Sequence, residues 1–254
     1  EYCHSGHHTM CSLLQGGTNF HPGGFAQYLR VPEVNVERGV FKIPSALTME
    51  EATFAEPLAC VIRGQNKMDI GPGSSVFVIG SGISGILHVA LAKSKCAQNI
   101  VAADISEYRL SQAQKFGANK TVFSDENIAD NLLKANGGKT ASNVIVCTGA
   151  VPAIEASLEV VDKGGTVLFF APTAQGATIP LSINEVFWKR DVTLTTTYAG
   201  APEDHVAALE QINKGAVPVK DMITHRLGLA DAQKGFDLVA KGGESVKVII
   251  LPHE

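Results

Sequence analysis

The residues best suited to chemistry form a glycine-rich hexapeptide, GSGISG, at residues 80–85. The pattern G-x-G-x-x-G is typical of a loop that holds a dinucleotide pyrophosphate, provided that a strand precedes it and a helix follows. An apolar run precedes it and helical spacing follows it. Gly80 permits a tight turn, Gly82 leaves room for the pyrophosphate and Gly85 lets the helix approach the strand. The alternative is a structural turn that binds no nucleotide.

A carboxylate at the expected distance completes this dinucleotide fingerprint. Asp104 stands 24 residues after Gly80, at the end of the next apolar run. It could accept hydrogen bonds from both adenosine ribose hydroxyls, and it would repel the 2′-phosphate of NADP. Ile105 follows instead of a basic residue, so the sequence predicts NAD as the cofactor. Arg109, one helical turn further, could stack on the adenine. Asp104 could also cap the helix that follows, and the two roles are compatible.

The elements that position these residues alternate regularly between residues 75 and 199. The predicted strands are Ser75–Gly80, Asn99–Asp104, Thr121–Ser124, Asn143–Thr148, Thr166–Ala171 and Val192–Tyr198. The predicted helices between them are Ser84–Lys95, Glu107–Phe116, Asn127–Asn136, Ala153–Val161 and Asn184–Lys189. Strands that are apolar on both faces are typical of a parallel sheet covered on both sides. The sequence therefore predicts an α/β fold with a doubly wound, six-stranded parallel Rossmann domain.

Ligands of such sheets bind outside the carboxyl ends of the strands. The expected dinucleotide contacts are Gly80, Gly82, Ile83, Ser84, Gly85, Asp104, Arg109, Thr148, Gly149, Ala171, Thr173 and Thr197.

The flanking segments differ from this centre. Residues 1–56 are punctuated by Gly and Pro, with β-like runs at Phe25–Val31 and Val34–Val36. Residues 200–254 carry helical patterns near Asp204–Lys214 and Asp231–Ala240 and a last strand, Ser245–Leu251. The sequence predicts a nucleotide domain flanked by two pieces of one other domain.

Composition excludes several classes of function. A net charge of −4 argues against a general nucleic-acid binder. No apolar run reaches the roughly 18 residues of a membrane span, and no leader peptide is recognisable. The chain opens without Met, so we expect sequence upstream of Glu1. Of the five cysteines, three lie in apolar stretches and are predicted to be core residues: Cys60, Cys96 and Cys147.

Several motifs, in this order and spacing, resemble one family. They are Cys3 and Cys11, Gly23–Tyr28, Glu56–Cys60, the loop at 80–85, Asp104 with Arg109, and Lys247–Ile250. The chain resembles the zinc-dependent medium-chain dehydrogenases, most closely their sorbitol/iditol and threonine dehydrogenase branch. The resemblance implies a partial catalytic domain with a GroES-like β-barrel core over 1–56, an NAD-binding domain over 57–199, and a return to the catalytic domain over 200–254.

The resemblance also implies two zinc sites. Cys3 and Cys11 match two of the four cysteines that hold a structural Zn²⁺, and the other two are expected upstream of residue 1. Nearby histidines could instead complete a Cys₂His₂ site, or could be solvated: His4, His7 and His8, with His21 as a further member of such a cluster. Glu56, placed just before a helix, matches the third ligand of the catalytic Zn²⁺. The alternative for Glu56 is an ordinary surface glutamate.

The implied activity is hydride transfer from a secondary alcohol, a polyol or a hydroxy amino acid, to NAD, with zinc lowering the pKa of the alcohol. Thr197 stands where polyol dehydrogenases often carry Arg, which argues against a sorbitol-like substrate. The alternatives are a zinc-free quinone or enoyl reductase of the same superfamily, and a non-catalytic dinucleotide-binding fragment. We expect a cytoplasmic homo-oligomer, a dimer or tetramer, with a small-molecule alcohol substrate and with neither nucleic acid nor membrane as a partner.

Overall fold

A computed structural model gives the fold and describes residues 2, 5–16 and 20–254. The chain divides into two compact units, which are treated separately below. Unit 1 comprises Glu1–Cys60 and Tyr198–Glu254, and unit 2 is the continuous stretch Val61–Thr197. These boundaries lie close to residues 57 and 199, the expected domain limits, and the assignment of separate domains stays a prediction.

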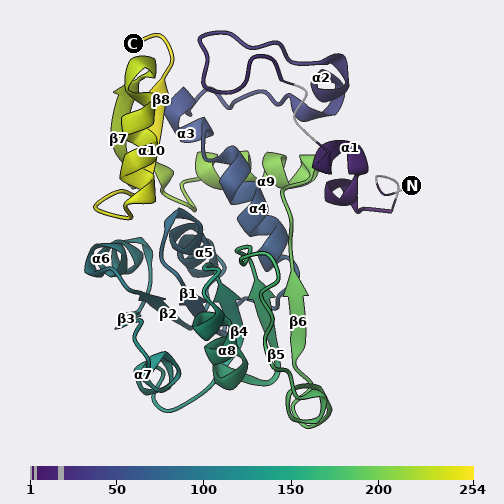
Figure 1. Cartoon of the computed structure of the whole chain (residues 1–254), viewed down its shortest axis with the longest axis vertical. Helices are drawn as coiled ribbons and strands as arrows, with labels where there is room; N and C mark the ends of the chain where they lie inside the picture. Colours follow the sequence, from purple (N-terminus) through teal and green to yellow (C-terminus); the bar gives the residue numbers. More distant parts are fainter. Residues whose placement is uncertain (1, 3–4, 17–19) are drawn as a thin grey trace. The chain divides into compact units, whose positions relative to one another are not determined.

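Unit 2 is built on a six-stranded sheet with the order β3-β2-β1-β4-β5-β6 (Figure 1). Every neighbouring pair of strands is parallel. The strands are β1 (Ser75–Ile79), β2 (Asn99–Asp104), β3 (Lys120–Phe123), β4 (Ala141–Val146), β5 (Val161–Phe169) and β6 (Thr193–Thr196). The strand order reverses between β1 and β4, and such a switch point is where open α/β sheets bind their ligands. The predicted α/β fold with a six-stranded parallel Rossmann sheet is confirmed, whereas the GroES-like β-barrel core stays a prediction.

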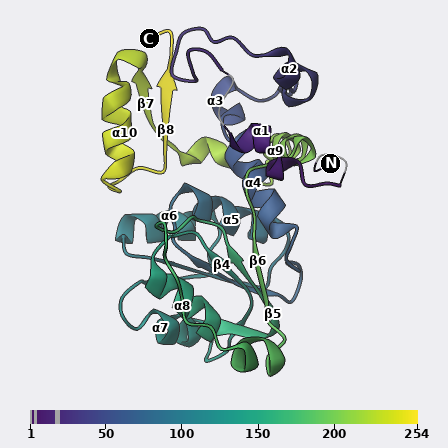
Figure 2. The same ribbon diagram turned by 45° about the vertical axis from the view of Figure 1, so that its right-hand side comes forward.

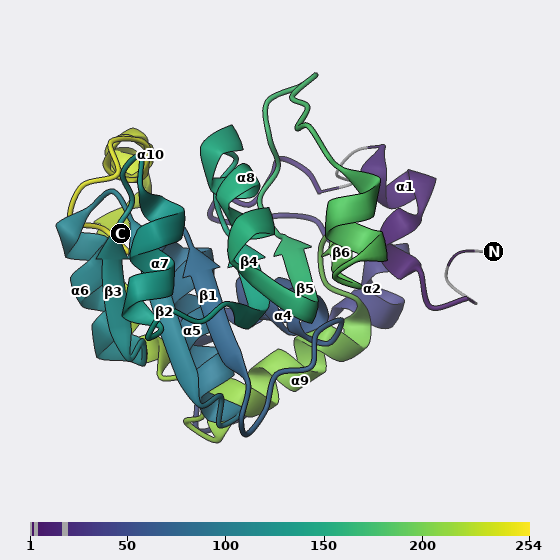
Figure 3. The same cartoon turned by 90° about the horizontal axis from the view of Figure 1, so that it is seen from below.

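Helices cover both faces of this sheet, as Figure 3 shows. They are α5 (Ile83–Ser94), α6 (Glu107–Phe116), α7 (Ile128–Ala135) and α8 (Val151–Val160), with a short π-helix, η2 (Asn184–Trp188), before β6. Alternate residues of each strand enter different cores. Val76 and Val78 pack with Val89 of α5, whereas Phe77 packs with Leu132 of α7. This two-sided burial explains why the strands read as continuous apolar runs.

Unit 1 contains short helices and a two-stranded parallel sheet, β7 (Ile223–Gly228) with β8 (Lys247–Leu251). Helix α10 (Ala232–Ala240) lies beside these strands (Figure 2). The remaining elements are η1 (His8–Met10), α1 (Ser12–Gln15), α2 (Glu33–Gly39), α3 (Met49–Ala52), α4 (Ala55–Gln65), α9 (Pro202–Asn213), η3 (Val219–Met222) and η4 (Leu229–Asp231). Helix α4 begins in unit 1 and ends in unit 2.

Two predictions about the first 56 residues and one about Cys96 are wrong in detail. Val34–Val36 belongs to α2 and is not β-like, because the carboxylate of Glu33 lies in the first turn, where the helix dipole favours a negative charge. Within the described residues, Phe25–Val31 forms one isolated bridge, between Arg30 and His21, and no described strand pairs with the rest. Cys96 is exposed and not a core residue, because it follows the end of α5 where the backbone turns with φ of +62°.

Candidate functional site

A cleft of about 340 Å³ opens at the carboxyl ends of β1 to β4 in unit 2. Its lining includes Gly80 and Gly82 of the loop, Asp104 after β2, and Thr148 after β4. Arg109 lines the same cavity, so five of the predicted contact residues lie together. The cleft lies at the switch point of the sheet, where a nucleotide is expected.

The glycines of the loop have the geometry that a phosphate cradle requires. Gly80 has φ of +97°, a conformation that side chains rarely adopt. A Cβ on Gly85 would lie 1.9 Å from the carbonyl oxygen of Gly80, so only glycine allows α5 to start this close to β1. A Cβ on Gly82 would meet nothing within 4 Å. Gly82 caps the N-terminus of α5, so this open space faces unpaired N–H groups that favour an anion.

The carboxylate of Asp104 is held firmly and is only 5% exposed. Its Oδ2 accepts a hydrogen bond from the Ser81 N–H at 2.7 Å, and its Oδ1 accepts one from the Ser106 N–H at 2.9 Å. Each carboxylate oxygen has two acceptor positions, so both retain capacity for a ribose hydroxyl. The Ser106 side chain, and not Asp104, caps α6 by accepting from the Arg109 N–H. The structure thus leaves Asp104 available for a ligand.

Arg109 enters the cleft from the first turn of α6. It lines the cavity, and its Nε is buried with no hydrogen-bond partner among the described residues. A buried, unpaired donor is costly unless a ligand or water accepts from it. Ile105, 73% exposed, lines the same cavity. An apolar side chain and a planar guanidinium are suited to a nucleobase, which agrees with the predicted stacking of Arg109 on adenine.

The other predicted contact residues lie outside the lining of this cleft: Ile83, Ser84, Gly85, Gly149, Ala171, Thr173 and Thr197. Gly149 approaches the segment after β5 closely, since a Cβ there would lie 2.4 Å from the carbonyl oxygen of Pro172. The Oγ1 of Thr197 is buried and has no partner in the described part of the chain. Sequence reasoning missed three lining residues after β3, namely Ser124, Asp125 and Ile128. Polar residues directly after that strand were the available signal.

Glu56 lies in unit 1, inside the first turn of α4 and not before the helix as predicted. Cys60, one turn further, donates its thiol hydrogen to Oε1 of Glu56 over 3.3 Å. Burial, and then the negative charge of Glu56, raises the pKa of the Cys60 thiol to about 12. Cys60 is therefore a protonated donor at neutral pH, and it is half-buried instead of a full core residue.

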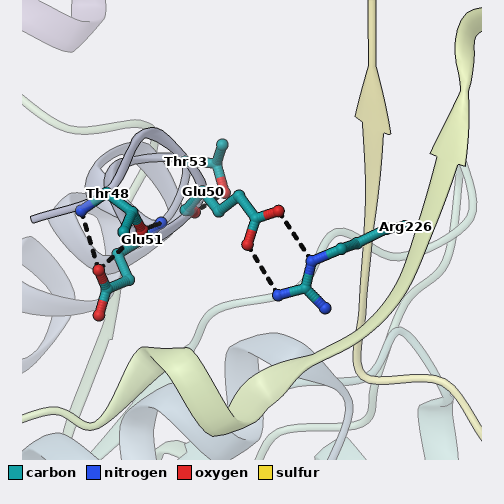
Figure 4. Close-up of polar contacts among 5 residues, drawn as sticks. All are labelled: Thr48, Glu50, Glu51, Thr53 and Arg226. Atoms are coloured by element: carbon teal, nitrogen blue, oxygen red, sulfur yellow. Dashed lines mark hydrogen bonds and ion pairs between the residues drawn. The ribbon is translucent and has the colours of Figure 1, made fainter. Parts of the chain in front are cut away.

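Hydrogen bonds hold helix α3, directly before α4, at two places (Figure 4). Thr48 and Glu51 form a capping box, in which each side chain accepts from the backbone N–H of the other. Glu50 receives two hydrogen bonds from Arg226 of β7, at 2.8 and 2.7 Å. These bonds lower the pKa of Glu50. Contacts within unit 1 thus anchor the segment that leads to Glu56.

The predicted structural zinc residues are only partly described. Cys3 and His4 lie outside the described residues, and Cys11 is half-buried at the start of α1. His7 and His21 are exposed, and His8 lies 3.8 Å from Glu203. Within the part of the chain that the structure describes, no three His, Cys, Asp or Glu side chains gather as metal ligands.

Comparison with known proteins identifies the family. The profile of the zinc-binding dehydrogenases matches residues 84–214. The erythritol/L-threitol dehydrogenase of Mycolicibacterium smegmatis is 32% identical over 99% of this chain and 68% of its own length. The chain belongs to the zinc-binding dehydrogenase family. A second relative of this zinc-binding dehydrogenase, the L-threonine 3-dehydrogenase of Enterobacter sp. (strain 638), is 30% identical over 98% of this chain and 70% of its own length.

A solved structure with the same fold contains a nicotinamide dinucleotide. A zinc-binding dehydrogenase from Sinorhizobium meliloti 1021, bound to NADP, is 26% identical with a TM-score of 0.75. The match covers 84% of this chain and 62% of that one, so the chain spans less than two thirds of its length. The predicted family is confirmed, together with the expectation of a nicotinamide dinucleotide and zinc as the family's cofactors and of small alcohols as its substrates.

The described residues fit the dinucleotide better than they fit a catalytic zinc. The empty space at Gly82, the unpaired Nε of Arg109 and the fixed carboxylate of Asp104 fit a dinucleotide. A catalytic zinc needs three protein ligands and an open position. Glu56 and the neighbouring Cys60 offer two candidates, and the described residues gather no group of three with them. These residues alone therefore do not fit a catalytic zinc, and no reaction step is derived through the metal.

Proposed function

We propose that this chain binds NAD in the cleft of unit 2 and acts in hydride transfer between the carbinol carbon of a small secondary alcohol and the nicotinamide. The observation that carries the proposal is the buried Asp104 carboxylate beside the open space at Gly82, in one cavity. The N-terminus of α5 would bind the pyrophosphate and Asp104 would orient the ribose. When bound, the dinucleotide supplies the hydride acceptor.

The proposed substrates are polyols or hydroxy amino acids. The support is the relatives that act on erythritol or L-threitol and on L-threonine, at 32% and 30% identity. Thr197, with its unpaired Oγ1, offers a neutral side chain where an Arg was expected for sorbitol-like substrates. Glu56 is proposed as one zinc ligand and Cys3 with Cys11 as two structural ones.

One alternative has an observation in its favour. The alternative is a non-catalytic dinucleotide-binding function, since the cleft with the loop at 80–85 and Asp104 lies wholly within unit 2. The family match to zinc-binding dehydrogenases argues against a zinc-free quinone or enoyl reductase.

The cytoplasmic location and the homo-oligomer belong to the same proposal. Among the described residues, Cys60, Cys96 and Cys147 form no disulfide, as is usual in a reducing compartment. In the described part of the chain no helix is both long and apolar enough to cross a membrane. Strand β6 ends the sheet, so its outer edge is available to a second copy. Analytical ultracentrifugation tests whether a dimer or tetramer forms.

The test of the proposed function is a fluorescence titration with NADH, followed by an activity assay. Gly82→Val fills the cradle and should abolish binding, whereas Gly71→Val should not. Gly71 is a matched control because a Cβ there also meets nothing within 4 Å and Gly71 does not line the cleft. Turnover of erythritol, threonine or a simple secondary alcohol with added zinc supports the dehydrogenase. Binding without turnover supports the non-catalytic alternative, and no binding refutes both.

A further inference from the structure

At one end of the cleft lies a carboxylate that contacts neither the pyrophosphate nor the ribose in the proposed binding of NAD. Asp125 follows β3 and lines the same cavity as Asp104. The neighbouring residue, Ser124, donates its N–H to the carbonyl oxygen of Asp104 at 2.9 Å. Moving along the sheet from β1 to β3, the cleft therefore presents the glycine loop, then Asp104, then Asp125. Pyrophosphate, ribose and base follow one another in the same order in a dinucleotide.

The side chains around Asp125 form a compartment suited to a flat base. Ile128 of α7 is 7% exposed, and with Ile105 it gives the cavity apolar lining. Arg109 adds a planar guanidinium whose Nε has no partner among the described residues. Rings bind to such surfaces through their faces, which leaves the edge of the base to be recognised by a polar group.

The Asp125 carboxylate is oriented and has acceptor capacity to spare. Its Oδ1 accepts hydrogen bonds from the Asn127 N–H at 2.8 Å and from the Asn131 Nδ2 at 3.1 Å. Its Oδ2 has no hydrogen-bond partner in the described part of the chain. An ionised carboxylate only accepts hydrogen bonds. It therefore favours a base edge that carries an amine and disfavours one that carries a carbonyl oxygen.

We propose that Asp125 selects adenine by accepting a hydrogen bond from its exocyclic 6-amino group. Hypoxanthine and guanine present a carbonyl oxygen at this position, and two acceptors facing each other repel. The inference rests on the proposed binding of NAD, and it adds a determinant of base specificity to that site.

The test compares reduced NAD with reduced nicotinamide hypoxanthine dinucleotide, in which a carbonyl oxygen replaces the amine. Both probes carry the same fluorescent nicotinamide, so one titration format measures both dissociation constants. The unmodified chain should prefer NADH by about tenfold, the usual value of a hydrogen bond to a charged group. Asp125→Asn keeps an acceptor for Asn127 and Asn131 and turns the other oxygen into a donor, so it should reduce or reverse the preference.

Asp130→Asn is the matched control. Asp130 is an exposed carboxylate in the first turn of α7 and does not line the cleft, so the same loss of charge there should leave the preference unchanged. Equal affinity of the unmodified chain for both probes would overturn the inference while leaving the binding of NAD intact. An equal shift of the preference in Asp125→Asn and Asp130→Asn would also overturn it. So would an Asp125→Asn variant in which only the affinity for NADPH, titrated in the same way, changes. Failure of every dinucleotide to bind would overturn the proposed function and this inference together.

Discussion

Replacing Asp104 by alanine tests the origin of the cofactor preference. The carboxylate is the proposed acceptor for the ribose hydroxyls, and it also receives the N–H groups of Ser81 and Ser106 at 2.7 and 2.9 Å. Its removal should therefore weaken NADH binding, relieve the repulsion of NADPH, and cost stability. These three effects can be measured separately.

The magnitudes follow from the burial of the carboxylate. Losing hydrogen bonds to a charged acceptor costs about 1.5–3 kcal/mol, so the NADH dissociation constant should rise by about 10- to 150-fold. A 2′-phosphate about 4 Å away would be repelled by about 4 kcal/mol per charge at an effective dielectric of 20. NADPH binding should therefore tighten or hold steady. The preference for NADH, expected to be at least about tenfold, should fall to near unity.

Fluorescence titration of both reduced cofactors measures this change. Thermal unfolding should show a free energy of unfolding lower by about 1–3 kcal/mol, because two N–H groups lose their acceptor. The titration should therefore be made well below the melting temperature of the variant. Asp162→Ala, at an exposed residue of β5 outside the cleft, is the matched control. Equal affinity of the unmodified chain for NADH and NADPH, or an unchanged ratio in Asp104→Ala, would refute the reasoning.

Three further results are expected. Gly85→Ala should abolish dinucleotide binding and lower the melting temperature, because the new Cβ would lie 1.9 Å from the carbonyl oxygen of Gly80. Burial lowers the pKa of His88 from 6.5 to about 3, so its contribution to stability is complete above pH 6.5 and declines as the pH falls toward 3. In chemical unfolding, the free energy of unfolding of His88→Leu should therefore fall less between pH 7 and 4 than that of the unmodified chain. An equal fall in both would contradict the lowered pKa. A double-mutant cycle on Glu50 and Arg226 should give a small coupling that weakens with salt. That coupling should be present above the ordinary pKa of glutamate and lost as the pH falls through the lowered pKa of Glu50; persistence at low pH would exclude an ion pair.

The parts of the fold that could be predicted are those in which neighbouring residues decide the outcome. The loop at 80–85 follows from local chemistry, since the turn, the open space and the close approach each demand glycine. Asp104 follows from the same logic, because it ends a strand adjacent to the loop. The run at Phe25–Val31 could not be interpreted in this way, because a strand depends on a partner elsewhere in the sequence.

The predictions that failed or were missed depend on distant residues. Nothing near Glu50 in the sequence indicates that Arg226 will bind it. The position of Asp125 in the cleft requires β3 to pair with β2 in one particular register, in which Asp104 lies opposite Phe123. The buried pair of Gln65 and His88 joins residues of α4 and α5 that the sequence separates by 23 positions. Such contacts are set by packing, which local patterns do not encode.

Unit 1 is formed by two segments from opposite ends of the sequence, and this affects when it can fold during synthesis. Unit 2 is continuous and has all its strands once Thr197 is synthesised. The first piece of unit 1 must wait, since Glu50 meets Arg226 only after 176 further residues and Thr53 meets Lys247 after 194. At typical ribosomal speeds of about 5–20 residues per second, the first wait lasts roughly 10–35 s. During that time Glu50 and Thr53 are without these partners while unit 2 can already form, so the early segment must be kept from aggregating until the last part of the chain emerges.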